Sequence, residues 1–426
     1  MTEKYKYPPR DNLLMDVVDL ERLTFMRRNG EFLLHDPERP VWFKIPPMGA
    51  LLLIVLREKD YPTFFVKELL NTTEERAEEI LNEFVGSLER KMKDIPPRKQ
   101  ERGLNVEANL TTSCTLKCRY CYLSYVSSKL LTTHQWMGIV DSAAQLNLNQ
   151  LTFSGGEPLL REDLFEIATF AHDLPLRTHL LSNGLIPKSR LSLLAQCFDS
   201  VQISIDGFSQ TQEYLRGAPF DVVIENMKAL VQLGIPLKAG ITLTSVNISE
   251  VLPLIQWLSS NGITQFHLSL FKEVGKGRNH PELSPSAEAV VRLFLEILEL
   301  GLNVDTLFHL MPRRFEKKVT CGAGTEVLSI MPDGDVYPCD ALISKEFFCG
   351  SAVHEELPDI YANSPTLEKL RTITVDTSAL CSVCDFRYLC GGGCISESFL
   401  KKGKIELPGP DCVFRKRFYE EFIWIA

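Results

Sequence analysis

The sequence predicts an α/β protein whose central part is built from repeated βα units. Short apolar runs that end in Gly, Asn or Asp, such as His179–Gly184 and Val201–Gly207, alternate with amphipathic segments such as Glu162–His172. This alternation is typical of a parallel sheet covered by helices. Polar residues follow the strand ends, where such sheets place their ligands. Twelve cysteines fall mainly into two sets that flank this region.

The first cysteine set is a loop that follows a predicted strand, Gly103–Leu110. Cys114, Cys118 and Cys121 are spaced so that three thiolates can bind three irons of a [4Fe–4S] cluster and leave the fourth iron without a protein ligand. An open iron site is suited to chemistry. The alternative is a structural zinc site, but zinc is normally closed by four Cys or His ligands, and no fourth ligand lies nearby in the sequence.

A glycine-rich segment about thirty residues after this loop supports a ligand site. The apolar run that begins at Leu151 ends in Gly155-Gly156-Glu157-Pro158. The two glycines allow the backbone to approach a small ligand closely, and Glu157 can accept hydrogen bonds from an ammonium group.

These motifs together resemble the radical S-adenosylmethionine (SAM) enzymes over about Gly103–Gly277. The resemblance implies a partial, TIM-like (β/α)6 barrel in which SAM binds the open iron. It also implies roles for seven further residues. Tyr120 would lie against the adenine, and Arg216 would pair with the methionine carboxylate, a good bidentate partner for a guanidinium. The methionine ammonium would contact Gly155, Gly156 and Glu157, and the ribose and carboxylate region would be lined by Ser182 and Ser204. Each polar residue could instead serve only in a strand-end turn or at the surface.

The second cysteine set occupies the C-terminal part of the chain. An Asp333-Gly-Asp turn predicts a β-hairpin that delivers Cys339 from its returning strand. The glycine run Gly391–Gly393 lets the backbone fold tightly around inorganic sulfides. Zinc is the alternative for Cys381–Cys394. The seven cysteines of this set are Cys321, Cys339, Cys381, Cys384, Cys390, Cys394 and Cys412.

This arrangement resembles the SPASM extension of many peptide-modifying radical SAM enzymes, which implies two auxiliary [4Fe–4S] clusters and three clusters in all. By resemblance, the inner cluster would be held by Cys321, Cys339 and Cys394, and the outer one by Cys381, Cys384, Cys390 and Cys412. Seven ligands leave one iron unassigned. Val327 stands where some relatives have another cysteine, so the inner cluster could keep an open iron or recruit Cys349 or an oxygen ligand. Cys349 could equally be a small buried residue, and Cys197 falls on the apolar stripe of a helix.

The first hundred residues predict a small winged-helix-like α+β domain. Leu23–Leu34 predicts two strands around an Asn-Gly turn, and Val41–Ile45 a third. Three helices follow, at Pro47–Glu58, Pro62–Leu70 and Thr73–Met92. We expect domains at 1–97, 98–312 and 313–426.

The order and size of these elements resemble the PqqD-like peptide-recognition domains. The resemblance implies that the leader of a precursor peptide adds a strand beside the third strand, against the last helix. DNA binding is the rival interpretation of a winged helix, but the acidic start of the last helix would repel phosphate. A purely structural cap on the barrel is the remaining alternative.

Composition sets the class of protein. The chain has 426 residues, 45% of them hydrophobic and 24% charged, as in ordinary globular proteins. The net charge of −9 argues against general nucleic-acid binding. We expect no membrane span and no secretory signal. Twelve cysteines without an export signal indicate thiolates that bind metals in the reducing cytoplasm.

The expected function is hydrogen abstraction from a precursor peptide by a 5′-deoxyadenosyl radical, with a thioether crosslink as the leading product. Carbon–carbon crosslinking and epimerisation stay open. Sulfatase-type oxidation, tetrapyrrole modification and non-catalytic metal binding are rival functions for the same cysteine pattern. The expected partners are the precursor peptide and a flavodoxin- or ferredoxin-type electron donor.

Overall fold

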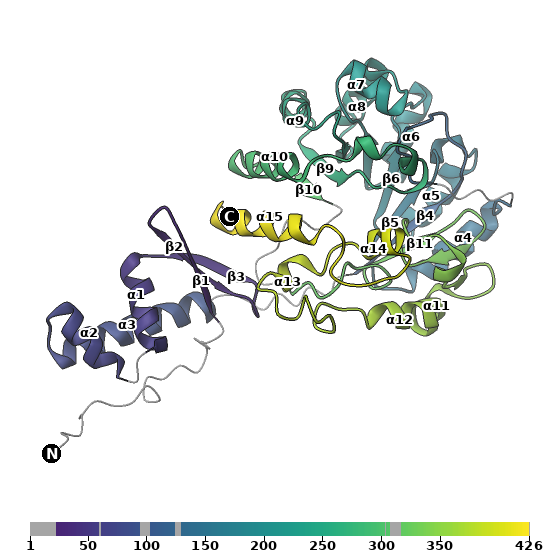
Figure 1. Cartoon of the computed structure of the whole chain (residues 1–426). Helices are drawn as coiled ribbons and strands as arrows, with labels where there is room; N and C mark the ends of the chain where they lie inside the picture. Colours follow the sequence, from purple (N-terminus) through teal and green to yellow (C-terminus); the bar gives the residue numbers. More distant parts are fainter. Residues whose placement is uncertain are drawn as a thin grey trace. The chain divides into compact units, whose positions relative to one another are not determined.

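A computed structural model of the chain describes residues 23–58, 61–93, 103–123, 129–302, 304–306 and 317–425. The chain divides into two compact units (Figure 1). The first comprises the described residues before 100, residues 317–319 and Val383–Gly391, and the second comprises the other described residues. The expected domain boundaries after residues 97 and 312 lie outside the described residues and stay predictions.

The first unit contains a three-stranded antiparallel sheet in the order β1-β2-β3, followed by three helices. Asn29 and Gly30 close the first hairpin with φ of 49° and 82°. Positive φ at both central residues gives the turn a twist that matches the strands. Thr73 caps the last helix, because its Oγ1 accepts a hydrogen bond from the Arg76 backbone N–H at 3.2 Å. These elements lie where the sequence predicts them: β1 (Thr24–Arg28), β2 (Glu31–Asp36), β3 (Val41–Ile45), α1 (Pro47–Glu58), α2 (Pro62–Leu70) and α3 (Glu74–Lys93).

One core joins the sheet and the helices of this unit. The apolar residues of α3 recur every three or four positions, so one face of the helix is buried. That face packs in a cluster with Leu34 of β2, Ile45 of β3 and Leu53 of α1. The buried residues of α3 are Ala77, Leu81, Val85, Leu88 and Met92.

A short segment from the C-terminal cysteine region also belongs to the first unit. It contains the helix α13 (Arg387–Cys390). Arg387 forms an ion pair with Glu38, in the turn between β2 and β3. Phe386 stacks on His35 of β2, with ring centroids 5.5 Å apart and ring planes at 16°. The segment that carries Cys384 and Cys390 is therefore held against this turn.

The second unit is built on one large sheet in the order β10-β9-β8-β7-β6-β5-β4-β11-β12-β13. Strands β4 to β9 are all parallel and follow one another in space as in sequence. The predicted partial (β/α)6 arrangement is therefore confirmed. The barrel strands are β4 (Leu104–Asn109), β5 (Leu148–Ser154), β6 (Thr178–Ser182), β7 (Ser200–Ser204), β8 (Leu237–Leu243) and β9 (Gln265–Leu270).

Helices connect these strands and bury their apolar faces on the sheet. The connection after β7 contains two helices, and α10 follows β9. Their bounds are α4 (Thr133–Ala144), α5 (Leu164–His172), α6 (Leu191–Cys197), α7 (Ser209–Arg216), α8 (Phe220–Gln232), α9 (Val251–Ser260) and α10 (Ala287–Glu299). The short 3-10 helices are η2 (Pro158–Leu160), η3 (Lys188–Arg190), η4 (Gly275–Asn279), η5 (Pro281–Leu283) and η6 (Lys345–Phe347).

The C-terminal part extends the same sheet. β11 lies parallel to β4 and turns back into antiparallel β12 through Gly334, whose φ is 90°. This hairpin confirms the turn predicted at Asp333-Gly-Asp, and Cys339 follows its returning strand. The remaining elements are β10 (Val304–Thr306), β11 (Val327–Ile330), β12 (Asp335–Tyr337), β13 (Gly350–Ser351), α11 (Leu357–Asn363), α12 (Pro365–Arg371), α14 (Ile395–Lys402) and α15 (Cys412–Ile425). Within the described residues, no helix combines the length and apolar character needed to cross a membrane.

Candidate active site

The three-cysteine loop follows the carboxyl end of β4. Cys114 is exposed, whereas Cys118 and Cys121 are half-buried. Two backbone contacts hold the loop in place. The Arg119 N–H donates to the Leu215 carbonyl at 3.0 Å, and the Cys121 N–H donates to the Cys118 carbonyl at 3.3 Å. The loop is thus fixed to the end of α7.

The cysteine thiols do not form a preassembled site for a single metal ion. No group of three or more His, Cys, Asp and Glu side chains in the described parts of the chain is arranged to hold one ion. A [4Fe–4S] cluster places each thiolate on a different iron, so its ligands stand further apart than those of one ion. None of the twelve cysteines forms a disulfide. This donor set suits clusters, since thiolates are the usual ligands of iron–sulfur centres.

Gly155 and Gly156 lie directly against this loop. The Gly156 N–H donates to the Thr111 carbonyl at 2.7 Å. A Cβ at Gly155 would stand 2.4 Å from the Thr111 carbonyl oxygen, and one at Gly156 would stand 2.2 Å from that of Ser113. Any other residue would push the two segments apart. The close backbone approach that the sequence predicts here includes an approach to the loop itself. Contact of these glycines with SAM stays a prediction.

Glu157 is a buried acceptor that joins the ends of two strands. Its carboxylate accepts from Ser182 Oγ at 3.0 Å and from the backbone N–H of Asn183 at 2.8 Å. It also accepts from the Leu159 N–H at 3.3 Å. Burial raises the pKa of Glu157. Glu157 and Ser182 therefore bind each other, and their expected contacts with SAM are not tested by this geometry.

Asn183 links the strand ends to the cysteine loop. Its Nδ2 donates to Thr115 Oγ1 at 3.1 Å and lies 3.9 Å from Cys114 Sγ. Asn183 was not among the predicted site residues. The signal was its position after β6, next to Ser182 and Gly184, where a polar side chain at a strand end can reach the site.

Tyr120 and Arg216 meet at a third residue, Asp206, which sequence reasoning also missed. Arg216 Nη1 donates to Tyr120 Oη at 2.7 Å and forms an ion pair with Asp206 at 3.3 Å. The Tyr120 hydroxyl in turn donates to Asp206. Burial raises the pKa of Tyr120 well above its usual value, so the phenol keeps its proton. The signal for Asp206 was its place after β7.

Arg216 keeps one donor available for a ligand. Its Nε is buried and has no hydrogen-bond partner among the described residues. A buried, unpaired donor of this kind fits the expected methionine carboxylate. The ring of Tyr120 packs with Leu215, Phe271 and Leu283, and Ser204 is half-buried at the last position of β7. Roles of Tyr120, Ser204 and Arg216 in SAM binding remain predictions.

Glu107 of β4 is a further acidic group that sequence reasoning missed. It accepts a hydrogen bond from Tyr122 Oη at 3.2 Å. Burial, and then the charge of Asp340, raise the pKa of Glu107 to about 7. Tyr122 follows Cys121 of the three-cysteine loop, and Asp340 follows Cys339 of the second cysteine set. Glu107 is therefore near residues that adjoin both cysteine sets.

The three cysteines expected to hold the inner auxiliary cluster come together in the second unit. Burial raises the pKa of Cys339 well above its usual value, and Cys394 and Cys321 are close enough to raise it further. Lys272, just after β9, lies near enough to Cys339 and Cys394 to interact with their charge. A lysine beside thiolates favours a cluster whose ligands are ionised.

Cys349 has local contacts of its own. It is buried, its Sγ donates to the Phe347 carbonyl at 3.3 Å, and burial raises its pKa to about 12. Burial and this hydrogen bond suit the structural interpretation of Cys349, and its alternative role as a cluster ligand stays a prediction. Cys197 is also buried, on α6, beside Thr169. The outer set is divided between the units: Cys384 and Cys390 belong to the first, and Cys381 and Cys412 to the second.

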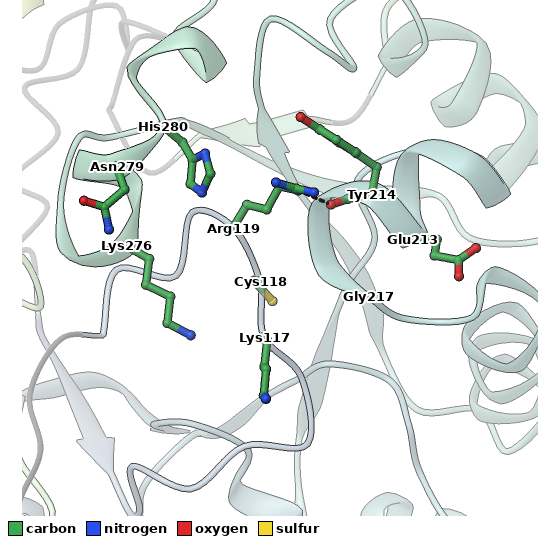
Figure 2. Close-up of a pocket in the computed structure, with 9 residues that line it drawn as sticks. All are labelled: Lys117, Cys118, Arg119, Glu213, Tyr214, Gly217, Lys276, Asn279 and His280. Atoms are coloured by element: carbon green, nitrogen blue, oxygen red, sulfur yellow. Dashed lines mark hydrogen bonds between the residues drawn. The ribbon is translucent and has the colours of Figure 1, made fainter.

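A cavity of about 390 Å³ opens beside the cysteine loop (Figure 2). Three segments of the second unit form it: the loop around Cys118, the end of α7 and the region of η4. Its lining residues are Lys117, Cys118, Arg119, Glu213, Tyr214, Gly217, Lys276, Asn279 and His280.

Two family profiles match the chain. Residues 108–258 match the radical SAM superfamily, and residues 321–385 match an iron–sulfur cluster-binding domain named SPASM. The chain is a radical SAM enzyme with a SPASM domain. SAM and iron–sulfur clusters are therefore its cofactors, and the ten cysteines of the two sets fit three [4Fe–4S] clusters.

Three related proteins align with most of this chain. The mycofactocin maturase MftC of Mycobacterium tuberculosis is 28% identical over 335 residues, which cover 74% of this chain and 84% of that protein. The AdoMet-dependent heme synthase of Methanosarcina barkeri is 26% identical over a region that covers 72% of this chain and 95% of that protein. The PqqA peptide cyclase of Granulibacter bethesdensis is 26% identical over a region that covers 73% of this chain and 87% of that protein.

The fold also matches a solved structure. Streptococcus suis SuiB bound to SAM superposes with a TM-score of 0.61 at 19% identity, covering 90% of this radical SAM chain and 96% of SuiB. At this identity the match establishes the fold alone. A match over 90% of 426 residues leaves about 43 unmatched, fewer than the described residues between 23 and 93. SuiB therefore has a counterpart for at least part of the N-terminal region.

Proposed function

We propose that this radical SAM enzyme modifies a ribosomally made precursor peptide, with a thioether crosslink as the leading product. The observation that carries the proposal is the combination of the three-cysteine loop with an N-terminal strand-and-helix unit that suits peptide binding. MftC is named as a maturase, PqqA peptide cyclase is named for a peptide substrate, and SuiB has been solved with its precursor peptide SuiA. These relatives support a peptide substrate and leave the bond type open.

The leader would bind along β3. Among the described residues, β3 pairs with β2 on one side only. A strand at the end of a sheet can accept an added strand whose main chain supplies the hydrogen bonds. α3 adjoins this strand, because Lys91 Nζ lies 5.4 Å from the centre of the Phe43 ring. A bound leader would therefore lie beside β3 with α3 as its second wall.

The residues around the cysteine loop position the cofactor. A [4Fe–4S] cluster held by Cys114, Cys118 and Cys121, with SAM bound to it, would supply radical chemistry able to act on an unactivated carbon. Gly155 and Gly156 keep the loop close to β5, and Glu157 fixes the end of β6 through Ser182. Arg216, held by Asp206, offers its Nε to the methionine carboxylate. These residues exclude water and set orientation.

Removing one cluster ligand tests the cofactor assignment. Cys118→Ala should abolish reductive SAM cleavage, measured as 5′-deoxyadenosine in anaerobically reconstituted protein. Cys197→Ala is the matched control, since Cys197 lies in the core and should leave the rate unchanged. Deoxyadenosine formation that persists in Cys118→Ala would contradict the assignment.

Leader binding is tested at the β3 edge. The probe is a fluorescent copy of a leader encoded by a short reading frame beside the gene, and binding is followed by anisotropy. Phe43→Ala should weaken binding about tenfold, the effect of losing one anchor of about 1.4 kcal/mol. Phe65→Ala, at an exposed position of α2, is the control. Equal binding by both variants would exclude β3 as the leader site.

Tetrapyrrole modification is the second candidate, because the heme synthase of Methanosarcina barkeri aligns over 95% of its length. A porphyrin side-chain product in the assay would favour it over a crosslinked peptide. We further propose that the enzyme works in the reducing cytoplasm and receives electrons from a flavodoxin- or ferredoxin-type protein. Twelve cysteines without a disulfide support that environment.

A further inference from the structure

The cavity beside Cys118 differs in charge from the chain as a whole. Its lining contains three permanent cations, Lys117, Arg119 and Lys276, and one carboxylate, Glu213. Three positive charges and one negative charge give the lining a net charge of +2 when His280 is neutral, whereas the whole chain carries −9. A positive concavity can attract acidic groups on a partner protein.

The shape of this cavity is fixed by contacts within the second unit. The guanidinium of Arg119 lies 4.1 Å from the centre of the Tyr214 ring, and its Nε donates to the Tyr214 carbonyl at 2.8 Å. On the opposite wall, the Lys276 N–H donates to the Cys121 carbonyl at 2.9 Å. Gly275 has a φ of 56°, and a Cβ there would stand 2.5 Å from the same carbonyl oxygen. The cavity is therefore preformed around the cluster loop.

The ends of the cationic side chains are available to a partner. Lys117 and Lys276 are exposed, and Figure 2 shows both lysines and Arg119 grouped around Cys118. Among the described residues, His280 is the one basic side chain of the lining with a carboxylate within hydrogen-bond distance, because its Nδ1 lies 2.9 Å from Glu282 Oε1. Two lysines thus remain to meet acidic groups on another molecule.

Cys118 gives the cavity a role in electron transfer. It is one of the expected cluster ligands and also lines the cavity. A donor seated here would reach a cluster ligand without an intervening layer of protein, and electron-transfer rates fall steeply with distance. Electron-transfer complexes have small interfaces and short lifetimes, so electrostatic steering contributes more to their formation than buried surface area does.

We propose that this cavity, lined by Lys117, Arg119, Lys276 and His280, is the docking surface for a small acidic electron-carrier protein. The proposal rests on the cluster at Cys114, Cys118 and Cys121 and on the proposed electron donor. In the docked complex one electron passes from the carrier to the cluster. The carrier is oxidised by one electron, the cluster is reduced by one, and no covalent bond forms or breaks.

The test reverses the charge of the two exposed lysines. The double variant Lys117→Glu/Lys276→Glu is prepared as the anaerobically reconstituted full chain, and the probe is reduced flavodoxin. Cluster reduction is followed by the loss of iron–sulfur absorbance. We expect the wild-type rate at low salt to fall at least tenfold in the variant, within the range of electrostatic steering. High salt should slow the wild type and leave the variant almost unchanged.

Two controls distinguish a loss of carrier docking from damage to the enzyme itself. Lys369→Glu, at an exposed position of α12, makes the same charge change elsewhere and should keep the wild-type rate. Photoreduced deazaflavin, a small neutral reductant, should reduce the variant as fast as the wild type and support equal SAM cleavage. Binding of oxidised flavodoxin, measured by quenching of its flavin fluorescence, should weaken at least tenfold in the double variant only.

Several results would overturn the proposal. The double variant could accept electrons from flavodoxin at the wild-type rate, or lose the deazaflavin reaction equally, in which case the lysines act on the cluster itself. Displacement of flavodoxin by inorganic phosphate, but not by chloride at equal ionic strength, would indicate a small-anion site instead. The deazaflavin reaction reports separately on the proposed catalytic chemistry.

Discussion

Substituting Gly156 by alanine probes the contact between the glycine segment and the cysteine loop. The new methyl group would stand 2.2 Å from the Ser113 carbonyl oxygen, 2.6 Å from the Ser113 carbonyl carbon and 2.8 Å from the Thr112 carbonyl oxygen. Real Cβ atoms keep at least 3.0 Å from such atoms. All three neighbours are backbone atoms, so no side-chain rotation can relieve the clash.

The required displacement sets the size of the effect. The two segments must separate by 3.0 − 2.2, or 0.8 Å, to reach the shortest tolerated distance, and by 3.4 − 2.2, or 1.2 Å, to reach ordinary contact. Ser113 directly precedes Cys114, so the cluster loop moves with it. A misplacement of about 1 Å can cost about 100-fold in rate, which is about 2.7 kcal/mol of transition-state stabilisation.

The assay is reductive SAM cleavage without a peptide substrate, measured as 5′-deoxyadenosine from anaerobically reconstituted protein. We expect Gly156→Ala to be about 100-fold slower than the wild type. Gly138→Ala is the control, because a Cβ at this exposed position of α4 would meet nothing within 4 Å. It should cleave SAM normally and gain about 0.5–1 kcal/mol in stability. A Gly156→Ala enzyme with wild-type iron content and rate would refute the reasoning.

Three further predictions concern buried charged groups. Asp206→Asn removes the carboxylate that pairs with Arg216, whose side chain is only 12% exposed. The free energy of unfolding, measured by urea titration, should therefore fall by roughly 3 kcal/mol. A loss below about 1 kcal/mol would contradict this. Burial lowers the pKa of His35 from 6.5 to about 4, so its contribution to stability is complete above pH 6.5 and is lost as pH falls towards 4, by about 3 kcal/mol. His35→Gln should flatten this part of the stability curve, and identical pH profiles for the two proteins would be evidence against it. Burial and Asp340 raise the pKa of Glu107 from 4.5 to about 7, so the folded protein should lose stability as pH rises from 4.5 to 7, while Glu107→Gln should not. The carboxyl stretching band in the infrared spectrum should titrate near pH 7 and be absent from the variant; a band that titrates near pH 4.5 would disprove the shift.

Periodicity and turn chemistry were sufficient to predict the elements of the N-terminal unit and several strands of the barrel. α1 and α2 begin and end at the predicted residues, and β3 spans the predicted range. The Asn29-Gly30 turn and the Gly334 turn are required by local backbone conformation, so a single sequence can reveal them. α5 begins at Leu164, later than the predicted Glu162, since residues at a helix start are the least constrained by periodicity.

The candidate site was predictable only in part. Cysteine spacing predicts three cluster ligands on one loop, and this assignment stays a prediction. The partners of these residues were not predictable. Asp206 accepts hydrogen bonds from the Tyr120 hydroxyl and from Arg216, and Asn183 donates one to Thr115. Most of these partners lie on segments that are distant in sequence. Hydrogen bonds of this kind depend on sheet register, which spacing within one segment does not encode.

The sequence by itself therefore determined the chemistry, because the type and spacing of cysteines decide which metal centre a loop can bind. Only the tertiary structure decided the surroundings: that Glu157 binds Ser182, that Arg216 keeps its Nε available, and that Lys117 and Lys276 gather around Cys118. The physical reason is the separation along the chain of the residues that interact. Metal ligation by one loop is a local property of the chain, whereas burial, charge and backbone clashes act between segments that meet only when the sheet forms.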